Sequence, residues 1–366
     1  MTSLEALVTL NLLPKIGPVR VRRLLERFDS AEAVLKASKD RLMQVDGIGE
    51  ETSGILLKWQ DHADPTKELS EVTQRGLSIV TPDDPAFPPA LRQAYDAPLF
   101  LYVWGKLEER DRHAIGVVGT RRITHYGREA TKKLSYQLAH AGFTIVSGLA
   151  RGVDTVAHEA ALAAGGRTVA VLGSGLAKLF PAENLALAEK IASGHGAVVS
   201  EFPLHTAPDK QTFPQRNRIV AAWSEALLVT ECPAWSGSLI TANLASDYGR
   251  PVYAVPGPIN APTSTGCNKL IRDGATLVMD ASDIADDLGE LPFARQTSVK
   301  EADSRAVPEL PPEEAQVFSA LGEGESGVDR LIERTGLPAQ TVSATLMKLE
   351  MRRLVRALPG FRYVKR

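Results

Sequence analysis

Residues 119–122, Gly-Thr-Arg-Arg, come directly after an apolar run at 114–118 and shortly before Tyr126 and Gly127, which open a helical pattern. A glycine turn followed by a helix start presents free backbone amides to an anion, and an arginine fork fits a phosphate through two hydrogen bonds. We therefore predict that Gly119, Thr120 and Arg121 bind a phosphate group. The turn is not GxGxxG, and GxxxxGK[ST] does not occur, so neither a dinucleotide cofactor nor P-loop ATP hydrolysis is expected.

The segment 210–219 places two cations and an aromatic residue within seven positions, Lys210, Phe213 and Arg216, and continues with Asn217. An apolar stretch at 219–223 indicates that this segment begins a helix. Cations bind phosphates and an aromatic ring offers a platform for an unstacked base, which are the contacts that single-strand binding requires. The alternative interpretation is an exposed helix start with one buried phenylalanine.

Further turns of small residues, hydroxyls and cations come after other apolar runs. Residues 147–154 include Gly148 and Arg151, and residues 236–242 include Gly237, Ser238 and Thr241. Small residues let the backbone approach a ligand, and hydroxyls and amides at a helix start suit phosphate. Lys269, in the glycine-bounded segment 266–274, is expected to extend the cationic rim.

Three titratable side chains raise the question of catalysis. Asp154 and His158 share a helix face, and Glu231 follows the apolar run at 226–229. No serine or cysteine nucleophile accompanies them in a recognisable elbow. We therefore favour helix capping and packing for the Asp154 and His158 pair, and a hydrogen-bonding role for Glu231 over that of a general base.

Seven short apolar runs alternate with helical patterns between residues 113 and 280, and this alternation predicts how the polar turns are positioned. The runs lie at 114–118, 143–146, 168–172, 197–199, 226–229, 252–255 and 276–279. Buried strands that alternate with helices indicate a doubly wound, mostly parallel α/β sheet. Ligands of such sheets bind beyond the carboxyl ends of the strands, where the turns described above gather.

The flanking regions predict two smaller modules. Residues 1–65 contain two apolar-Gly-helix units and are similar to a tandem helix-hairpin-helix (SAM-like) domain, which either contacts DNA phosphates or packs as a helical module. Residues 66–285 form the α/β domain, in which 99–104 is expected to be an edge strand or a bridging segment. An acidic linker at 286–311 leads to three helices and a terminal hairpin at 312–366, the pattern of a winged helix.

The composition limits the class of protein. A chain of 366 residues is longer than a single hydrophobic core usually stabilises, so several domains are expected. Two cysteines exclude a disulfide framework and a multi-cysteine zinc site. No metal and no cofactor is predicted. No apolar run is long enough to span a membrane and the start lacks a basic n-region, so a cytoplasmic location without membrane contact is expected.

The net charge of −2 hides an uneven distribution. Residues 110–279 hold 17 Lys and Arg against 12 Asp and Glu, residues 280–325 hold 3 against 12, and residues 326–366 hold 9 against 3. The α/β block and the tail are therefore basic, which suits a nucleic-acid partner. In the tail, the candidate accessory DNA contacts are Arg352, Arg353, Arg356 and Arg362, with a protein-binding winged helix as the alternative.

Taken in order, the motifs between 113 and 280 strongly resemble the DprA/Smf DNA-processing family. They include VGTRR, SGLARGVD, FPQRNRIVA and SGSLITA. This sequence has Gly-Thr-Arg where many relatives have Gly-Ser-Arg. The resemblance implies an extended Rossmann-like fold and a non-enzymatic protein that binds single-stranded DNA, works as a homodimer and loads the recombinase RecA in natural transformation and repair.

The resemblance also implies which residues hold the strand. By motif position, Arg121, Lys210, Phe213, Arg216 and Asn217 would grip it, and the pocket would be lined by Gly148, Gly237, Ser238 and Thr241. Two other functions stay open. The first is a nucleotide phosphoribohydrolase that uses Glu231, although its Gly-Gly-x-Gly-Thr turn is absent. The second is a winged-helix transcriptional regulator that prefers one duplex sequence.

Overall fold

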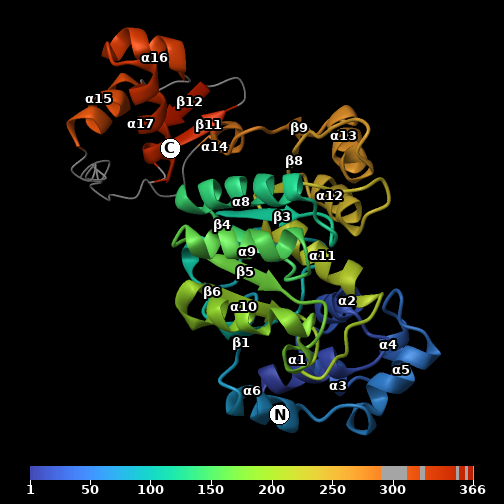
Figure 1. The fold of residues 1–366 in the computed structure, drawn as a ribbon. Helices are drawn as coiled ribbons and strands as arrows, with labels where there is room; N and C mark the ends of the chain where they lie inside the picture. The colour runs from blue at the N-terminus through green and yellow to red at the C-terminus, as the bar shows by residue number, and fades with distance from the viewer. Residues whose placement is uncertain (290–310, 322–325, 352–353, 359–361, 366) are drawn as a thin grey trace. The chain divides into compact units, whose positions relative to one another are not determined.

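A nine-stranded sheet forms the centre of the first of two units in the computed structural model (Figure 1). The structure describes residues 1–289, 311–321, 326–351, 354–358 and 362–365. The first unit spans Met1–Arg295 and the second Gln296–Arg366. The strand order is β1-β2-β6-β5-β4-β3-β7-β8-β9.

Seven of these strands are parallel, as the alternating apolar runs predict. They are β3 (Ala114–Val118), β4 (Thr144–Ser147), β5 (Thr168–Val171), β6 (Gly196–Ser200), β7 (Ala226–Val229), β8 (Val252–Ala254) and β9 (Thr276–Leu277). The chain builds outward from β3 to β6 and then returns to the other side of β3 to add β7 to β9. This reversal puts a topological switch point between β3 and β7, where such sheets bind ligands. The predicted doubly wound fold is confirmed.

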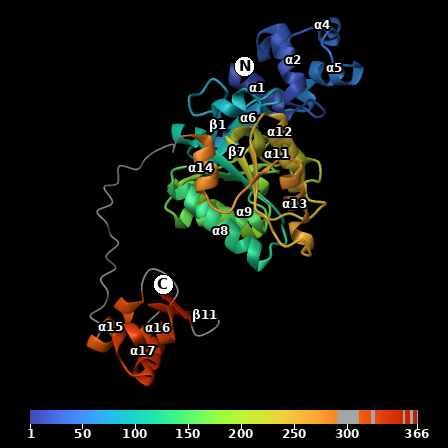
Figure 2. The same cartoon turned by 90° about the horizontal axis from the view of Figure 1, so that it is seen from above.

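Alternate residues of the central strands point to opposite faces, and each face is covered by its own helices (Figure 2). One face packs on α8 (His125–His140), α9 (Val153–Ala163) and α14 (Ser282–Leu288); the other packs on α11 (Thr212–Trp223), α12 (Gly237–Asp247) and α13 (Thr265–Arg272). Near β5 and β6, α10 (Leu185–Lys190) closes a smaller core. Burial on both faces explains why these strands read as continuous apolar runs.

The segment at 99–104 differs from our expectation. Strand β2 (Leu101–Gly105) is antiparallel and lies between β1 (Ser78–Val80) and β6, so it is not an edge strand. The outer edge is β1, whose three residues are too few to show a strand periodicity. Tyr102 is buried against the helical module, whereas Leu101 and Val103 point to the opposite face and are buried in the core shared with α11.

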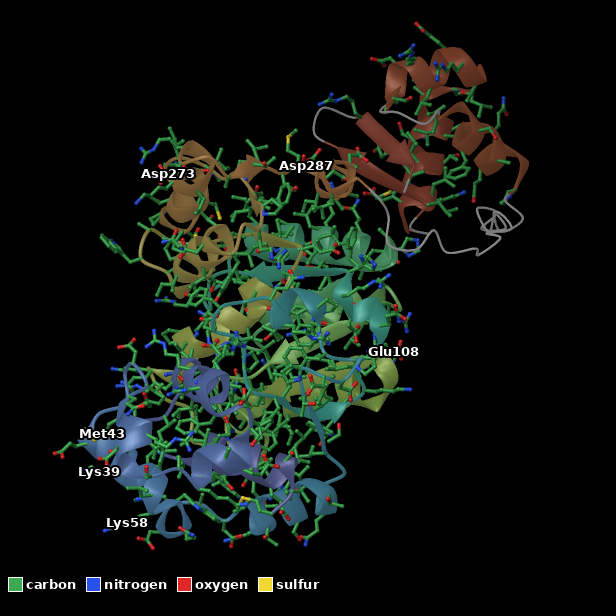
Figure 3. The ribbon with its side chains drawn as sticks, turned by 180° about the vertical axis from the view of Figure 1, so that it is seen from behind. Lys39, Met43, Lys58, Glu108, Asp273 and Asp287 are labelled. Carbon is green, nitrogen blue, oxygen red and sulfur yellow. The ribbon has the colours of Figure 1, made fainter. Side chains whose placement is uncertain are left out.

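The amino-terminal module consists of α1 (Ser3–Leu12), α2 (Pro18–Phe28), α3 (Ala31–Leu35), α4 (Lys39–Met43), α5 (Glu50–Leu57), η1 (Trp59–Asp61) and α6 (Pro65–Gln74). Gly17 and Gly49 are the N-caps of α2 and α5, so both predicted glycine turns are present. The inner face of the module shares a core with Leu99, Phe100 and Tyr102 of the α/β sheet region. Its outer surface carries Lys39, Met43 and Lys58 (Figure 3).

A packed helix occupies the beginning of the stretch where we expected a linker. In α14, Ile284 is fully buried against the α8 and α9 face, and Asp287 accepts a hydrogen bond from the Tyr253 hydroxyl at 2.5 Å. These residues belong to the first unit. Residues 290–310, the rest of the expected linker, lie outside the described residues, and the exact domain boundaries stay predictions.

The second unit has the predicted winged-helix architecture. Helices α15 (Pro312–Ala320), α16 (Val328–Thr335) and α17 (Ala339–Met351) enclose a core that includes Val317, Leu331 and Leu346. Strands β11 (Val355–Leu358) and β12 (Arg362–Lys365) form the terminal hairpin, and β10 (Ser326–Gly327) adds a third strand that the sequence did not indicate.

Within the described ranges, no helix combines the length and the apolar character needed to cross a lipid bilayer.

Candidate functional site

A groove of about 490 Å³ opens at the carboxyl ends of β3 and β7, at the switch point of the sheet. It is lined by the turn after β3, the loop after β4, the segment that begins α11, and the loop and helix start after β7. Four segments that are far apart in the sequence therefore meet here. Of the predicted site residues, those that line the groove are Gly119, Thr120, Arg121, Lys210, Phe213, Arg216, Asn217, Gly237, Ser238 and Thr241.

The turn after β3 is fixed by the backbone of the neighbouring strand end. The amide of Thr120 donates to the carbonyl of Glu231 at 2.8 Å, and the Thr120 hydroxyl accepts from the amide of Arg122 at 3.1 Å. A Cβ on Gly119 would lie 2.5 Å from Cγ2 of Val153 and 2.7 Å from the Glu231 carbonyl oxygen. Only glycine fits this close approach. Arg121, two residues further along the same turn, is exposed at the groove.

Arg121 lies over the ring of Phe213, with its Cζ 4.9 Å from the ring centroid. The ring is half-buried and also contacts Phe180, at a centroid distance of 6.0 Å. This cation-π contact orients the guanidinium without neutralising its charge. In this arrangement Phe213 already has an arginine on its face.

Arg216 lies at the base of the groove, and its side chain is almost completely buried. Its Nη1 donates to the carbonyls of Gly148 and Val171, and its Nε donates to Oδ1 of Asn217 at 3.1 Å. Burial lowers the pKa of Arg216, an effect that nearby Asp154 opposes. The predicted residue Gly148 contributes here by leaving room, since a Cβ would collide with this guanidinium. Arg216 therefore braces the groove, and a direct contact with a ligand stays a prediction.

The start of α12 forms the second wall. Ser236 caps the helix, with its Oγ accepting from the amide of Ser238 at 3.3 Å. The Thr241 hydroxyl donates to the carbonyl of Gly237 at 3.3 Å, and a Cβ on Gly237 would meet open space. The first amides of α12 therefore border the groove, as expected for an anion site.

Two predicted cations lie outside the groove lining. Arg151 is exposed and forms a two-pronged ion pair with Glu183, at 2.5 and 2.6 Å. That pairing raises the pKa of Arg151 through a hydrogen bond and charge attraction. Lys269 is exposed on α13. Glu183 could not be identified as a partner in advance, because 32 positions separate it from Arg151.

Asp154 stabilises the loop before its helix and does not cap the helix. Its Oδ2 accepts from the amides of Gly148 at 3.1 Å and Ala150 at 3.3 Å, whereas the N-cap position of α9 is Gly152. Burial raises the pKa of Asp154. Our expectation of a helix cap was wrong, because the carboxylate accepts from amides of the preceding loop and the N-cap position is taken by Gly152, whose φ is positive.

His158 is fully buried behind this loop. Its Nε2 accepts from the amide of Leu149 at 3.3 Å, and its Nδ1 lies 2.6 Å from the hydroxyl of Thr168. Burial lowers the pKa of His158 to about 3, so the imidazole is neutral at physiological pH. These contacts agree with the packing interpretation of the pair.

Glu231 acts as a strut between two segments. Its two carboxylate oxygens accept from the amide of Thr124 at 2.9 Å and from the Thr124 hydroxyl at 2.7 Å, and the side chain is buried. A Cβ on Gly127 would collide with the same carboxylate. A carboxylate that is held at both oxygens and shielded from solvent is poorly placed to act as the general base of a phosphoribohydrolase.

The sequence interpretation missed several lining residues. Arg122 adds a further exposed cation, and the α12 wall includes Pro233, Trp235 and Ile240. Trp235 is 97% exposed. A tryptophan between a proline and the SGS helix start was a signal that could have been used, since a strand-end loop faces the ligand in this fold.

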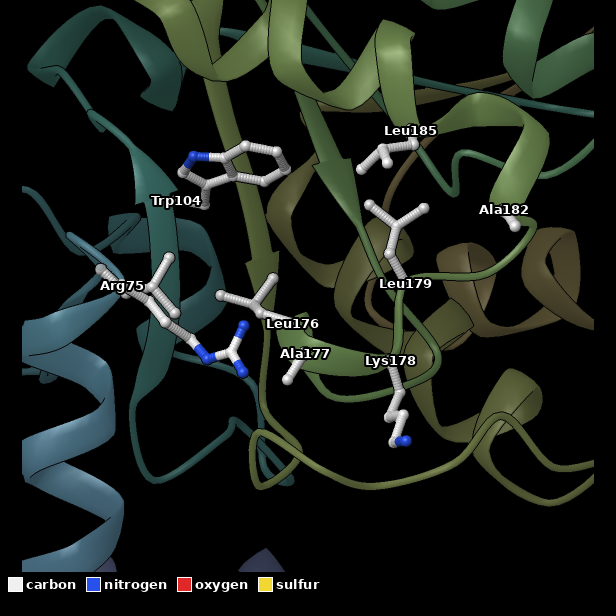
Figure 4. A pocket seen from close by; sticks show the side chains of 9 residues that line it. Arg75, Trp104, Leu176, Ala177, Lys178, Leu179, Ala182 and Leu185 are labelled. Carbon is white, nitrogen blue, oxygen red and sulfur yellow. The ribbon is translucent and has the colours of Figure 1, made fainter.

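A second recess, of about 600 Å³, contains none of the predicted residues (Figure 4). It lies beside Trp104 of β2, with Leu176 and Leu179 across from it and Lys178 at its rim. Its other cation, Arg75, is paired with Glu71 at 2.7 Å. This recess is mainly apolar and differs in chemistry from the groove at β3.

The predicted accessory residues of the tail are only partly described. Arg352 and Arg353 lie outside the described residues. Arg356 lies on β11, and Arg362 lies on β12, where its side chain is exposed. Their role as DNA contacts stays a prediction.

The fold and the groove define a Rossmann-like α/β protein that carries a cation-lined groove at the switch point of its sheet, with a helical module before it and a winged-helix module after it. The chain belongs to the DprA/Smf family. The family model described as DNA recombination-mediator protein A matches residues 78–289, the DprA winged helix domain matches 301–360, and a SAM-like helix-hairpin-helix tandem matches 7–54.

Individual relatives support the same assignment. Protein Smf of Synechocystis sp. is 35% identical, with 96% of each chain covered, and Protein Smf of Escherichia coli is 39% identical, with 86% of each covered. The crystal structure of DNA processing protein A from Streptococcus pneumoniae is 31% identical and has a TM-score of 0.68, covering 78% of this chain and 98% of that one. A Helicobacter pylori structure, described for its single-stranded DNA binding mode, is also 31% identical with a TM-score of 0.52, covering 58% and 95%.

Proposed function

We propose that this protein binds single-stranded DNA in the groove between β3 and β7 and passes it to the recombinase RecA, as a non-enzymatic mediator of recombination in transformation and repair. The observation that carries the proposal is the charge of the lining. Arg121, Arg122 and Lys210 are exposed at the groove, and the one carboxylate among its lining residues, Asp154, is buried. The Helicobacter pylori relative, whose structure is described for single-stranded DNA binding, supports the same ligand.

The contacts follow from the chemistry of the walls. The exposed cations pair with phosphates, and these contacts do not depend on base identity. Such contacts give affinity without sequence preference and make it depend on salt. Binding in this mode involves no bond making or breaking. This agrees with the contacts of Glu231, because both of its carboxylate oxygens already accept hydrogen bonds from Thr124.

Fluorescence-anisotropy titration of labelled oligothymidine across a salt series tests the proposal. Arg121→Ala and Lys210→Ala should each weaken binding, and each lost phosphate contact should reduce the log-log salt slope by roughly 0.7. Lys178→Ala, an exposed cation outside the groove, is the matched control and should leave the slope unchanged. Unchanged slopes in both groove variants would overturn the proposal.

The proposal also includes dimer formation and the loading of RecA. Strand β9 ends the sheet, and Leu277 within it and Met279 just beyond are 42% and 72% exposed, an open apolar edge that suits pairing with a second copy. Light scattering of the purified protein tests the homodimer. RecA-dependent ATP hydrolysis on strands coated with single-strand-binding protein tests loading; no acceleration by this protein would exclude it.

The winged helix is proposed to add duplex binding. Competition between duplexes of different sequence separates this role from that of a transcriptional regulator. Equal affinity for all duplexes is the expected result, because phosphate contacts carry no sequence information.

A further inference from the structure

The two walls of the groove differ in chemistry. Its lysine and arginine residues all come from the turn after β3 and from the start of α11. The wall after β7 contributes no cation to the lining and carries the apolar residues Pro233, Trp235 and Ile240. A single strand has the same asymmetry, with charged phosphates along one edge and flat apolar bases along the other.

Trp235 stands out on the apolar wall, because 97% of its surface is exposed. A tryptophan usually buries most of its large ring, and an exposed ring that borders a groove marks a surface for recognition. In the first turn of α12, Ile240 is 48% exposed and lines the same groove. Among the described residues, the wall therefore presents an apolar surface that is open to solvent.

The loop that carries Trp235 is held at both ends. Before it, the carbonyl of Cys232 accepts from the amide of Gly266 at 2.9 Å, and the Cys232 side chain is fully buried. After it, Ser236 caps α12. An anchored loop fixes the backbone that carries Trp235, so little backbone ordering is required when a ligand binds.

The other aromatic residue of the groove is already engaged. The Phe213 ring is half-buried, with Arg121 over it at 4.9 Å and Phe180 at 6.0 Å. Stacking on Phe213 requires Arg121 to leave the ring, whereas the indole of Trp235 needs no such displacement. The sequence-based choice of Phe213 as the base platform therefore names the less accessible of the two rings.

We propose that Trp235 is the base-stacking residue of the groove, so that a single strand binds with its phosphates toward Arg121 and Lys210 and its bases toward the α12 wall. This inference rests on the proposed function and adds the orientation of the strand. Stacking tolerates any base, because every base has a flat face, and it requires the base to be unpaired. Trp235 consequently selects single strands over duplexes.

The test compares oligothymidine with an abasic oligomer of the same number of phosphates, both by fluorescence anisotropy. Trp235→Ala should weaken oligothymidine binding by about 10-fold and leave abasic binding within about two-fold, since stacking on one base accounts for a loss of that order. Trp235→Phe should restore most of the oligothymidine affinity. Lys210→Ala should weaken binding of both oligomers alike and reduce the salt slope.

Ile259→Ala is the matched control, because Ile259 is 98% exposed and lies outside the groove lining. Thermal unfolding should be unchanged in the Trp235 variants, whose side chain has no buried surface to lose. Equal oligothymidine affinity of wild type and Trp235→Ala would overturn the inference and leave the proposed function standing. Loss of dimer formation without loss of DNA affinity would likewise overturn it, by assigning the indole to a protein contact. Failure of the wild type to bind any oligomer would overturn the proposed function and this inference together.

Discussion

The groove at β3 and the amino-terminal hairpins share one local pattern, a glycine turn that precedes a helix start, yet their charges are arranged differently. In the hairpins, Lys39 pairs with Glu50 at 3.0 Å and Arg23 pairs with Asp46 at 2.6 Å, and Lys15 pairs with Glu51. At the groove, Arg121 and Lys210 form no ion pair with a described carboxylate. A turn motif therefore predicts free amides, whereas anion binding also depends on cations that the fold leaves uncompensated.

The two regions also differ in how tightly their glycines are enclosed, and this difference carries the largest expected effect. Gly119→Ala should lower the free energy of unfolding by about 3 kcal/mol, because the added Cβ meets a backbone carbonyl that cannot move aside. Gly17→Ala should lower it by about 1 kcal/mol or less, since a Cβ there has no neighbour within 4 Å and only the N-cap preference changes. Urea denaturation of both variants measures the contrast. Equal losses would show that the two turns are packed alike.

The amino-terminal hairpins and the groove region also differ in their buried titratable groups. No titratable side chain is buried within residues 1–65, whereas His158 is buried behind the groove with its pKa lowered to about 3. Between about pH 6.5 and pH 3 the unfolded chain binds a proton at this histidine and the folded chain does not, so acid destabilises the fold there. From pH 7 to pH 5, this group should lower the free energy of unfolding by about 2 kcal/mol.

The His158→Gln variant isolates that contribution, because glutamine does not titrate. Its unfolding free energy should fall less steeply than that of the wild type over the same pH range. The comparison of slopes also removes the opposing effect of Asp154, whose pKa is raised by burial in both proteins. Parallel curves would mean that His158 takes up its proton in the folded state.

The sequence predicted the sheet better than the site. Seven strands were predicted from buried apolar runs, which are local signals. Strand β1 was not predicted, because its three residues are too few to show a periodicity. Arg121 was expected at the groove because a turn follows a strand there, and it does line the groove, whereas Arg151 in the turn after β4 does not; contact with DNA stays a prediction. Arg216 could not be assigned in advance, because its burial depends on carbonyls of Gly148 and Val171 that only the folded sheet brings to it.

Charge reversal tests whether uncompensated cations separate the two regions in function. Arg121→Glu should weaken oligothymidine binding by about 10-fold or more, since it removes a charge-assisted contact and adds repulsion. Lys39→Glu in the hairpin should change the affinity by less than about two-fold, because that lysine is already neutralised by Glu50. Titrations at one fixed salt concentration give both values. A comparable loss in Lys39→Glu would assign the hairpins to the DNA-binding surface.

The smallest expected effect comes from releasing a cation that the fold has paired. Arg151 follows Ala150, which lines the groove, and is held by Glu183. Glu183→Gln should free Arg151 and raise the affinity for oligothymidine by about two-fold at low salt, an increase that vanishes as salt screens an exposed charge. Glu50→Gln frees Lys39 in the same way, yet should have no effect, because Lys39 is not among the groove residues. If both variants bind oligothymidine more tightly, freeing a cation is enough to add affinity wherever that cation lies. If only Glu183→Gln does, the freed cation must also lie beside the groove.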